Sequence, residues 1–361
     1  MFRVTFAGRL VLLGVAAAIV ASACGGTSSP PAAVDVGSGS LTGAGATFPA
    51  PYYQKAFYDY NVKYPNVTIN YQPVGSGAGI QQFIKKTVDF GASDVPMAAA
   101  DITTAGGPDT LTQIPTTLGV ISIAFNITGV SSLKLDADTL SGIYLGTIKN
   151  WNDPKLTALN SGTSLPSKAI TVVHRSDGSG TTYHFTDYLS KVSADWKSKV
   201  GTSKSVSWPV GVGASGNQAV AQAITSTEGA VGYVELAYVV SAQMHQAALK
   251  NANGKFVTAS VAGATAAAAQ NTSVSPTNFS ITNEPGDTTY PIAGFSWVIL
   301  STAYTDAAKG RAVVYLFKWL VSADGQNEGT DLQYAPLPSA VQALAQANLK
   351  LVKAGGTPIL S

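Results

Sequence analysis

Short glycine-rich turns that separate strand-like from helix-like segments constrain the fold of this chain more than any other feature. GAGATF (43–48), GSGAG (75–79) and DGSGTT (177–182) each precede a run with helical periodicity. Strand-like runs at 67–74 and 169–175 stand before the second and third turns. Alternation of strands and helices is typical of an α/β architecture, so we expect mixed, mostly parallel sheets.

The three turns also share a form that suits an anion. Each places small residues and a hydroxyl at an expected helix N-terminus, where the first backbone N–H groups lack helical partners and the helix dipole is positive. Three such turns, one of them beside Arg175, could together surround an anion. The alternative is that all three only cap their helices. A fourth turn of this form, at 211–224, has no independent feature that assigns it to a site.

The N-terminus has the pattern of a processing signal. Arg3 and Arg9 precede an apolar run at 10–20, which is too short to span a bilayer comfortably and has the proportions of a signal-peptide core. We therefore expect a signal peptide at 1–23.

Cys24, the only cysteine of the chain, follows this signal directly. A lone thiol at that place resembles the lipid attachment site of a bacterial lipoprotein, although Ala21 stands where leucine is usual. The alternative is an ordinary cleaved signal with an incidental cysteine. Residues 24–40 are rich in Gly, Ser and Pro, which is typical of a flexible linker. We expect an extracytoplasmic globular body anchored to the cell membrane.

The charge composition limits the kinds of partner. The chain carries 22 basic and 20 acidic residues, and cleavage before Cys24 would remove two arginines and leave the two signs balanced. Any attraction for an anion must then be local. No dense basic patch gives a reason to expect nucleic-acid binding.

Seven segments carry a resemblance to a known family. In this order they resemble the substrate-binding lipoproteins of bacterial phosphate ABC importers, the PstS family: TGAGATFPAPYYQKAF, VGSGAGIQQF, VDFGASDVP, GIYLGTIKNWNDPKL, VVHRSDGSGTTYHFTDYL, GAVGYVELAY and YAPLP. The match extends from Leu41 to Pro338. It implies a monomer that binds inorganic phosphate with high affinity and delivers it to the permease subunits of an ABC importer, without catalysis and without a cofactor.

The resemblance also implies a fold and a site. The fold would be the two-lobed periplasmic-binding-protein fold, with mixed sheets and a two-segment hinge. Lobe 1 would be discontinuous, comprising 41–125 and 291–361, and lobe 2 would span 126–290. The implied phosphate ligands are Thr47, Phe48, Ser76, Asp94, Arg175, Ser179, Gly180 and Thr181. Of these, Phe48 and Gly180 would act through backbone N–H groups, and Asp177 would orient the guanidinium of Arg175.

Asp94 is the most informative of these residues, because a carboxylate repels an anion. A phosphate ion near neutral pH keeps at least one P–OH group, whose hydrogen Asp94 can accept, whereas sulfate has none. A site built around such a buried hydrogen bond rejects the analogue that lacks it by roughly 10⁴–10⁵. The alternative is that Asp94 is a helix N-cap.

Arg175 suits the same chemistry, because its planar guanidinium can grip two oxygens at once. The alternative is a surface ion pair with Asp177, since residues i and i+2 share a face of a strand. Both interpretations can hold together.

Three other functions remain open at this point. A secreted phosphatase or serine hydrolase could use Ser76 or Ser179, but neither is framed as G-x-S-x-G and no His-x-x-x-His pair or carboxylate cluster indicates a catalytic metal. A receptor for another small oxyanion is possible, although Asp94 disfavours fully deprotonated ligands. A surface protein without a ligand would use the turns only as caps.

Overall fold

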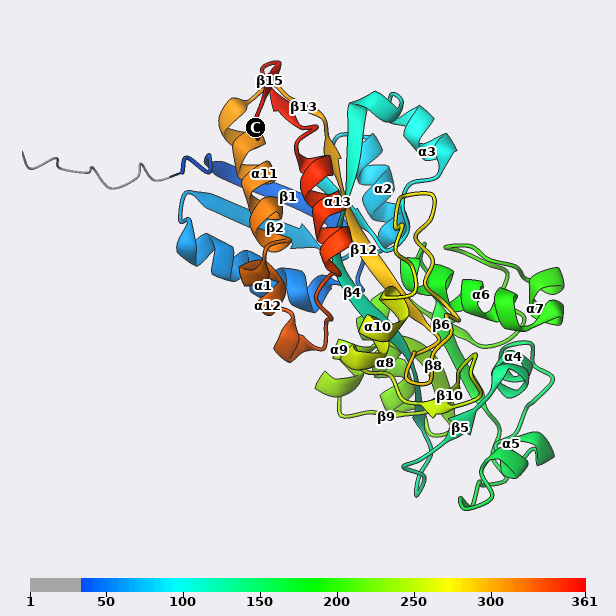
Figure 1. The fold of residues 1–361 in the computed structure, drawn as a ribbon. Coiled ribbons are helices and arrows are strands. Elements are labelled where there is room, and N and C mark those ends of the chain that lie inside the picture. The colour runs from blue at the N-terminus through cyan, green and yellow to red at the C-terminus, as the bar shows by residue number, and fades with distance from the viewer. Residues whose placement is uncertain (1–33) are drawn as a thin grey trace, which may run out of the picture. The chain divides into compact units, whose positions relative to one another are not determined.

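The structure is a computed structural model that describes residues 34–361 (Figure 1). The expected signal peptide and Cys24 lie outside the described residues. Val36–Ser361 form one compact unit. Strand β1 (Gly39–Gly45) begins two residues before the expected start of lobe 1 at residue 41, and its first residue is paired because the Gly39 N–H donates to the Asn66 carbonyl at 2.9 Å. Residues 39 and 40 therefore belong to the sheet and not to the linker.

Nine strands of the described part of the chain form one mixed sheet (Figure 1). In spatial order they are β2 (Val67–Gln72), β1, β3 (Phe90–Ser93), β12 (Ala293–Ser301), β4 (Leu111–Asn126), β8 (Ala230–Glu235), β6 (Thr171–Arg175) and β7 (Val212–Ala214), with β9 (His245–Gln246) on β4.

Strand β4 divides this sheet into two parts by changing partners. Its residues 111–120 pair with β12, and its residues 121–126 pair with β8. We call β2, β1, β3, β12 and residues 111–120 the first half-sheet, and residues 121–126 with β8, β6 and β7 the second half-sheet.

The pairings correct the expectation of mostly parallel sheets. Parallel pairs join β1 to β2 and β3, and β6 to β7 and β8. The pairs that involve β4 or β12 are antiparallel, and they are half of the eight pairings in the described sheet. The reason is that β4 leads the chain from the first half-sheet to the second and β12 leads it back.

Two sets of helices pack on the sheet (Figure 1). The first set contacts the first half-sheet either directly or through a neighbouring helix. It comprises α1 (Ala50–Lys63), α2 (Ser76–Ile84), α3 (Ala99–Thr104), α11 (Ala307–Leu320), α12 (Ala323–Asn327) and α13 (Ser339–Leu349). Those that lie in the chain between β4 and β12 are α4 (Ala137–Tyr144), α5 (Pro154–Leu159), α6 (Gly180–Val192), α7 (Ala194–Lys199), α8 (Gly216–Ser226), α9 (Leu236–Ser241) and α10 (Val261–Ala268).

Small elements complete the described fold. They are two three-stranded sheets, formed by β5 (Lys134–Leu135), β10 (Ala248–Lys250) and β11 (Phe256–Val257) and by β13 (Ala303–Tyr304), β14 (Lys353–Ala354) and β15 (Thr357–Pro358), and two 3₁₀ turns at Pro108–Thr110 and Thr330–Leu332.

Each half-sheet has its own cluster of buried aromatic rings. Under the first, Phe90 meets Phe317 edge to face with ring centroids 4.9 Å apart. Under the second, Phe185 stacks on Tyr233 at 4.3 Å. The second cluster also holds the backbone at the end of β6, because the Tyr233 hydroxyl accepts a hydrogen bond from the backbone N–H of Arg175 at 2.9 Å. Aromatic packing therefore fixes the end of β6, from which the site is built.

Candidate functional site

The predicted helices begin where the glycine turns place them, and the turns come together. Thr47 and Phe48 lie between β1 and α1, Ser76 is the first residue of α2, and Ser179 is the N-cap of α6. Asp94 directly follows β3, which is parallel to β1. Parallel strands end at the same edge of a sheet, so Thr47, Ser76 and Asp94 lie together at the carboxyl ends of β1 and β3. The start of α6 joins them because the Gly180 N–H donates to Ser76 Oγ.

Asp94 is buried and held by two hydroxyl groups, one from strand β12 and one from the start of helix α2. Ser296 Oγ donates to Oδ1 at 2.7 Å and Ser76 Oγ donates to Oδ2 at 3.4 Å. Burial raises the pKa of Asp94 to about 7, although the Ser296 bond and the nearby charge of Arg175 act to lower it. Asp94 does not cap a helix, because α3 begins at Ala99 with Ala98 as its N-cap. The capping alternative is therefore wrong.

Gly180 brings the start of α6 into direct contact with Asp94. Its N–H donates to Ser76 Oγ at 3.1 Å. A Cβ atom at position 180 would lie 2.4 Å from Asp94 Cβ, a separation that real Cβ atoms do not show. Only glycine lets the first turn of α6 approach the carboxyl this closely.

Arg175 forms the ion pair with Asp177 that the spacing allowed, but the guanidinium is buried, so the expectation of a surface ion pair is wrong. Its Nε donates to Asp177 Oδ1 at 2.6 Å, its Nη2 donates to the other carboxylate oxygen, and its side chain is 1% exposed. Burial acts to raise the pKa of Asp177, but the hydrogen bonds and charge of Arg175 outweigh it and hold that pKa below its usual value. The remaining arm, Nη1, donates to Thr181 Oγ1 at 3.3 Å.

The peptide between Thr47 and Phe48 is oriented by a tyrosine. The Tyr238 hydroxyl donates to the Thr47 carbonyl at 2.6 Å. In a trans peptide the N–H points opposite to the C=O, so the Phe48 N–H faces away from Tyr238. The Thr47 side chain is tied to Thr181 through Asn217, whose Nδ2 lies 3.0 Å and 3.2 Å from their hydroxyl oxygens. Ser179 Oγ accepts from the Thr182 N–H at 3.1 Å and so also caps α6.

Sequence reasoning missed four residues that support this cluster: Ser296, His184, Asn217 and Tyr238. His184 is fully buried and its Nε2 donates to the Asp94 carbonyl at 2.8 Å. Burial lowers the pKa of His184, in keeping with a neutral ring that serves as a donor. Each of these except Ser296 had a sequence signal: Asn217 lies in the fourth glycine turn, and His184 and Tyr238 lie in two of the seven segments that carry the resemblance.

The cluster provides hydrogen-bond donors around one cation, which suits an anion better than catalysis or a metal. The hydrogen bonds of Ser76 and Ser179 in the described structure go to Asp94 and to backbone amides, so neither serine is paired with a histidine. Among residues 34–361, no three His, Cys, Asp or Glu side chains are grouped so that they could hold a metal ion.

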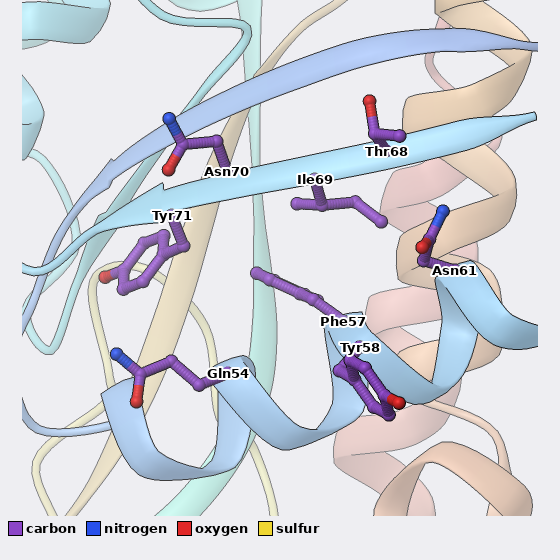
Figure 2. A pocket seen from close by; sticks show the side chains of 8 residues that line it. All are labelled: Gln54, Phe57, Tyr58, Asn61, Thr68, Ile69, Asn70 and Tyr71. Carbon is purple, nitrogen blue, oxygen red and sulfur yellow. The ribbon is translucent and has the colours of Figure 1, made fainter. Parts of the chain in front are cut away.

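A pocket of about 340 Å³ between α1 and β2 lies apart from this cluster (Figure 2). Gln54, Phe57, Tyr58 and Asn61 line it from α1, and residues 68–71 line it from β2. None of these side chains is charged, so the pocket offers an anion no counter-charge.

In the described chain no helix has the length and apolar character needed to cross a membrane.

Comparison with known proteins identifies the family. The profile of the "PBP superfamily domain" matches residues 30–323. The phosphate-binding protein PstS of Pasteurella multocida is 43% identical over 315 residues, covering 86% of this chain and 90% of that protein. PstS of Xylella fastidiosa strain 9a5c is 42% identical, covering 87% of this chain and 86% of that protein.

A solved structure agrees with this. It is a high affinity periplasmic phosphate-binding protein (PfluDING) bound with phosphate at pH 8.5. Its sequence is 25% identical to this chain, and the two structures superimpose with a TM-score of 0.71 over 86% of this chain and 93% of that chain. The expected α/β periplasmic-binding-protein fold with mixed sheets is confirmed. The chain belongs to the PstS family of phosphate-binding proteins, within the PBP superfamily.

Proposed function

We propose that this protein binds inorganic phosphate outside the cytoplasmic membrane and delivers it, without chemistry, to the permease of an ABC importer. The observation that carries this proposal is that Asp94, Arg175 and Gly180 lie close together among hydroxyl and backbone N–H groups that can donate hydrogen bonds. Relatives named for phosphate binding, 43% and 42% identical to this chain, support the same ligand.

The proposed ligand contacts are those implied by the sequence. Hydroxyl groups would come from Thr47, Ser76, Ser179 and Thr181, backbone N–H groups from Phe48 and Gly180, and charge-assisted bonds from the guanidinium of Arg175. Asp94 would accept the hydrogen of a P–OH group. Asp177 would hold the guanidinium in place without touching the ion, which agrees with its two hydrogen bonds to Arg175.

We further propose that phosphate binding closes two lobes, residues 41–125 with 291–361 and residues 126–290. Three contacts between these segments support this: the Gly77 N–H donates to the Gly178 carbonyl at 2.8 Å, Gly180 to Ser76, and His184 to Asp94. Because the ligand contacts come from both segments, phosphate has a higher affinity for the closed arrangement and shifts the population toward it. The permease would recognise that closed form.

Membrane attachment through Cys24 is part of the same proposal. In cells, Cys24→Ser is expected to release the protein from the membrane fraction, because the thiol is the only lipid attachment point the motif provides. Membrane fractionation with labelled fatty acid checks this, and Ser22→Ala is the matched control. Undiminished labelling of Cys24→Ser would contradict the anchor and leave phosphate binding untouched.

The deciding experiment is calorimetric titration of the protein after bound ligand has been stripped by partial unfolding. Phosphate should bind tightly with one site per chain, and sulfate should give no heat at a pH above the Asp94 pKa of about 7. Equal binding of both ions would keep an oxyanion receptor and overturn the role of Asp94. No binding of either ion would overturn the proposed function. Hydrolysis of a chromogenic phosphate ester would instead support an enzyme.

Gly180→Ala is expected to weaken phosphate binding by roughly 10- to 100-fold, the equivalent of about 1–3 kcal/mol of overpacking. The added methyl group would lie 2.5 Å from Asp94 Oδ2 and would force α6 away from the carboxyl. Titration calorimetry measures the loss. Gly162→Ala is the control, because a Cβ there meets nothing within 4 Å. Equal affinities of the two variants would show that α6 does not need this approach.

A further inference from the structure

Asn217 connects the two sides of the site and uses all of its side-chain polar atoms. It is fully buried in the first turn of α8. Its backbone N–H and its Nδ2 donate to Thr47 Oγ1 at 3.1 Å and 3.0 Å, and Nδ2 also donates to Thr181 Oγ1 at 3.2 Å. Its Oδ1 accepts from the backbone N–H of Glu235 at 3.1 Å.

These contacts fix the direction in which the amide faces. The Glu235 N–H can only donate, so the oxygen of the Asn217 amide must face it. The NH₂ group must then face the two threonine hydroxyls. A flipped amide would set two donors against each other at Glu235 in a fully buried place, which is costly.

The fixed amide in turn sets the direction of both hydroxyl groups. Thr47 Oγ1 accepts two hydrogen bonds from Asn217, and Thr181 Oγ1 accepts one from Asn217 and one from Arg175 Nη1. A hydroxyl has two lone pairs and one proton. With both lone pairs engaged, each threonine keeps its proton for another acceptor and cannot accept a hydrogen bond from a ligand.

The turn before Asn217 is shaped to reach these partners. Gly216 has φ +78°, and a Cβ there would lie 3.3 Å from Thr47 Cγ2. Its N–H donates to Asp177 Oδ1 at 3.0 Å. The same turn therefore contacts the carboxylate that orients Arg175 and places Asn217 between the two threonines.

We propose that Asn217 is a positioning residue that makes Thr47 and Thr181 obligate donors and thereby sets the ligand's protonation pattern. The ligand must present unprotonated oxygens to both threonines, which leaves Asp94 as the acceptor for its P–OH group. This inference rests on the proposed phosphate-binding function and adds to it the residue that enforces donor direction.

Two substitutions test this by titration calorimetry with phosphate. Asn217→Ala removes the Nδ2 donor and lets both hydroxyls rotate, so phosphate should bind about tenfold more weakly, the equivalent of one lost net hydrogen bond. Asn217→Asp puts an acceptor where the donor was, so both hydroxyl protons turn toward it and the loss should reach at least about 100-fold. Gln218→Glu, which adds the same charge at the next, exposed position, is the control and should change Kd less than about threefold.

A double-mutant cycle separates positioning from a merely structural role. In a Thr47→Val, Thr181→Val background there are no hydroxyls to direct, so Asn217→Ala should change the phosphate Kd less than about twofold. A structural role would give the same loss in both backgrounds and would overturn the proposal.

The outcomes distinguish this inference from the proposed function. If the wild-type protein does not bind phosphate, the proposed function fails. If the wild-type protein binds and Asn217→Ala binds equally well, only the positioning role fails. Thermal unfolding of the ligand-free variants accompanies each titration. Should Asn217→Ala not fold, Asn217→Ser takes its place in the cycle, and failure of both to fold would assign Asn217 a structural role and overturn the proposal.

Discussion

Asp94→Asn is expected to keep phosphate binding within about tenfold while it removes most of the roughly 10⁴-fold discrimination against sulfate. Asp94 is 1% exposed, so bulk solvent screens little of the repulsion between its carboxylate and an anion that lacks a hydrogen. The asparagine amide keeps an oxygen that can accept from P–OH. It also has an NH₂ group that can donate to a sulfate oxygen. The substitution therefore removes the repulsion that excludes sulfate.

Competition titrations measure this selectivity directly, with sulfate displaced by phosphate at a pH above the Asp94 pKa of about 7, where the carboxyl is ionised. Asp101→Asn is the matched control, because it removes the same charge from α3, where Asp101 faces Lys204 at 3.8 Å outside the site. That variant should still reject sulfate. An Asp94→Asn protein that also rejects sulfate would show that the carboxylate does not set the selectivity.

Asp94 is also expected to make the stability of the ligand-free protein depend on pH. Burial raises its pKa from 3.8 to about 7, so the folded protein holds this proton more tightly than the unfolded chain does. Its contribution to stability is then fully present below pH 3.8, declines as the pH rises, and is lost once the pH passes about 7. The denaturant concentration at the unfolding midpoint should therefore decrease as the pH is raised from 3.8 to about 7, and it should decrease more steeply than in Asp94→Asn. Parallel curves for the two proteins would contradict a raised pKa.

Arg175→Ala is expected to weaken phosphate binding by about 10²–10⁴, since charge-assisted hydrogen bonds contribute about 1.5–3 kcal/mol each and a guanidinium can make two. Arg175 is also the partner of the half-buried Asp177, whose side chain is 15% exposed. Its removal leaves that carboxylate beside the site without compensation, which repels the anion and destabilises the fold.

Binding and folding are separated by measuring both. Titration calorimetry gives the phosphate Kd, and thermal unfolding of the ligand-free protein gives the change in stability. Lys191→Ala is the control, because it removes the ion pair with Asp187 on the same helix α6 at 3.1 Å without touching the site. Unchanged phosphate affinity in Arg175→Ala would show that the proposed ligand set is misplaced even though the family is right.

The local parts of the candidate site could be predicted from residues that are close together in the sequence. Glycine, hydroxyl and helical periodicity predicted where α1, α2 and α6 begin, because caps and turns depend on residues close in the chain. The pairing of Arg175 with Asp177 could be predicted for the same reason, because residues two apart point to the same side where the chain is extended. The overall α/β class followed from the alternation of segments.

The residues that complete the candidate site from distant parts of the chain are brought to it by tertiary packing. Ser296 reaches Asp94 because β12 pairs antiparallel to β3 with Trp297 opposite Ser93, a register set across about 200 residues of chain. Asn217 reaches the threonines because β7 pairs with β6 so that Ala214 lies opposite Arg175, which brings the following turn to the start of α6. Strand register depends on the packing of whole faces and not on local spacing, so the glycine turn at 211–224 did not indicate which residues Asn217 would contact, and Ser296 had no motif at all.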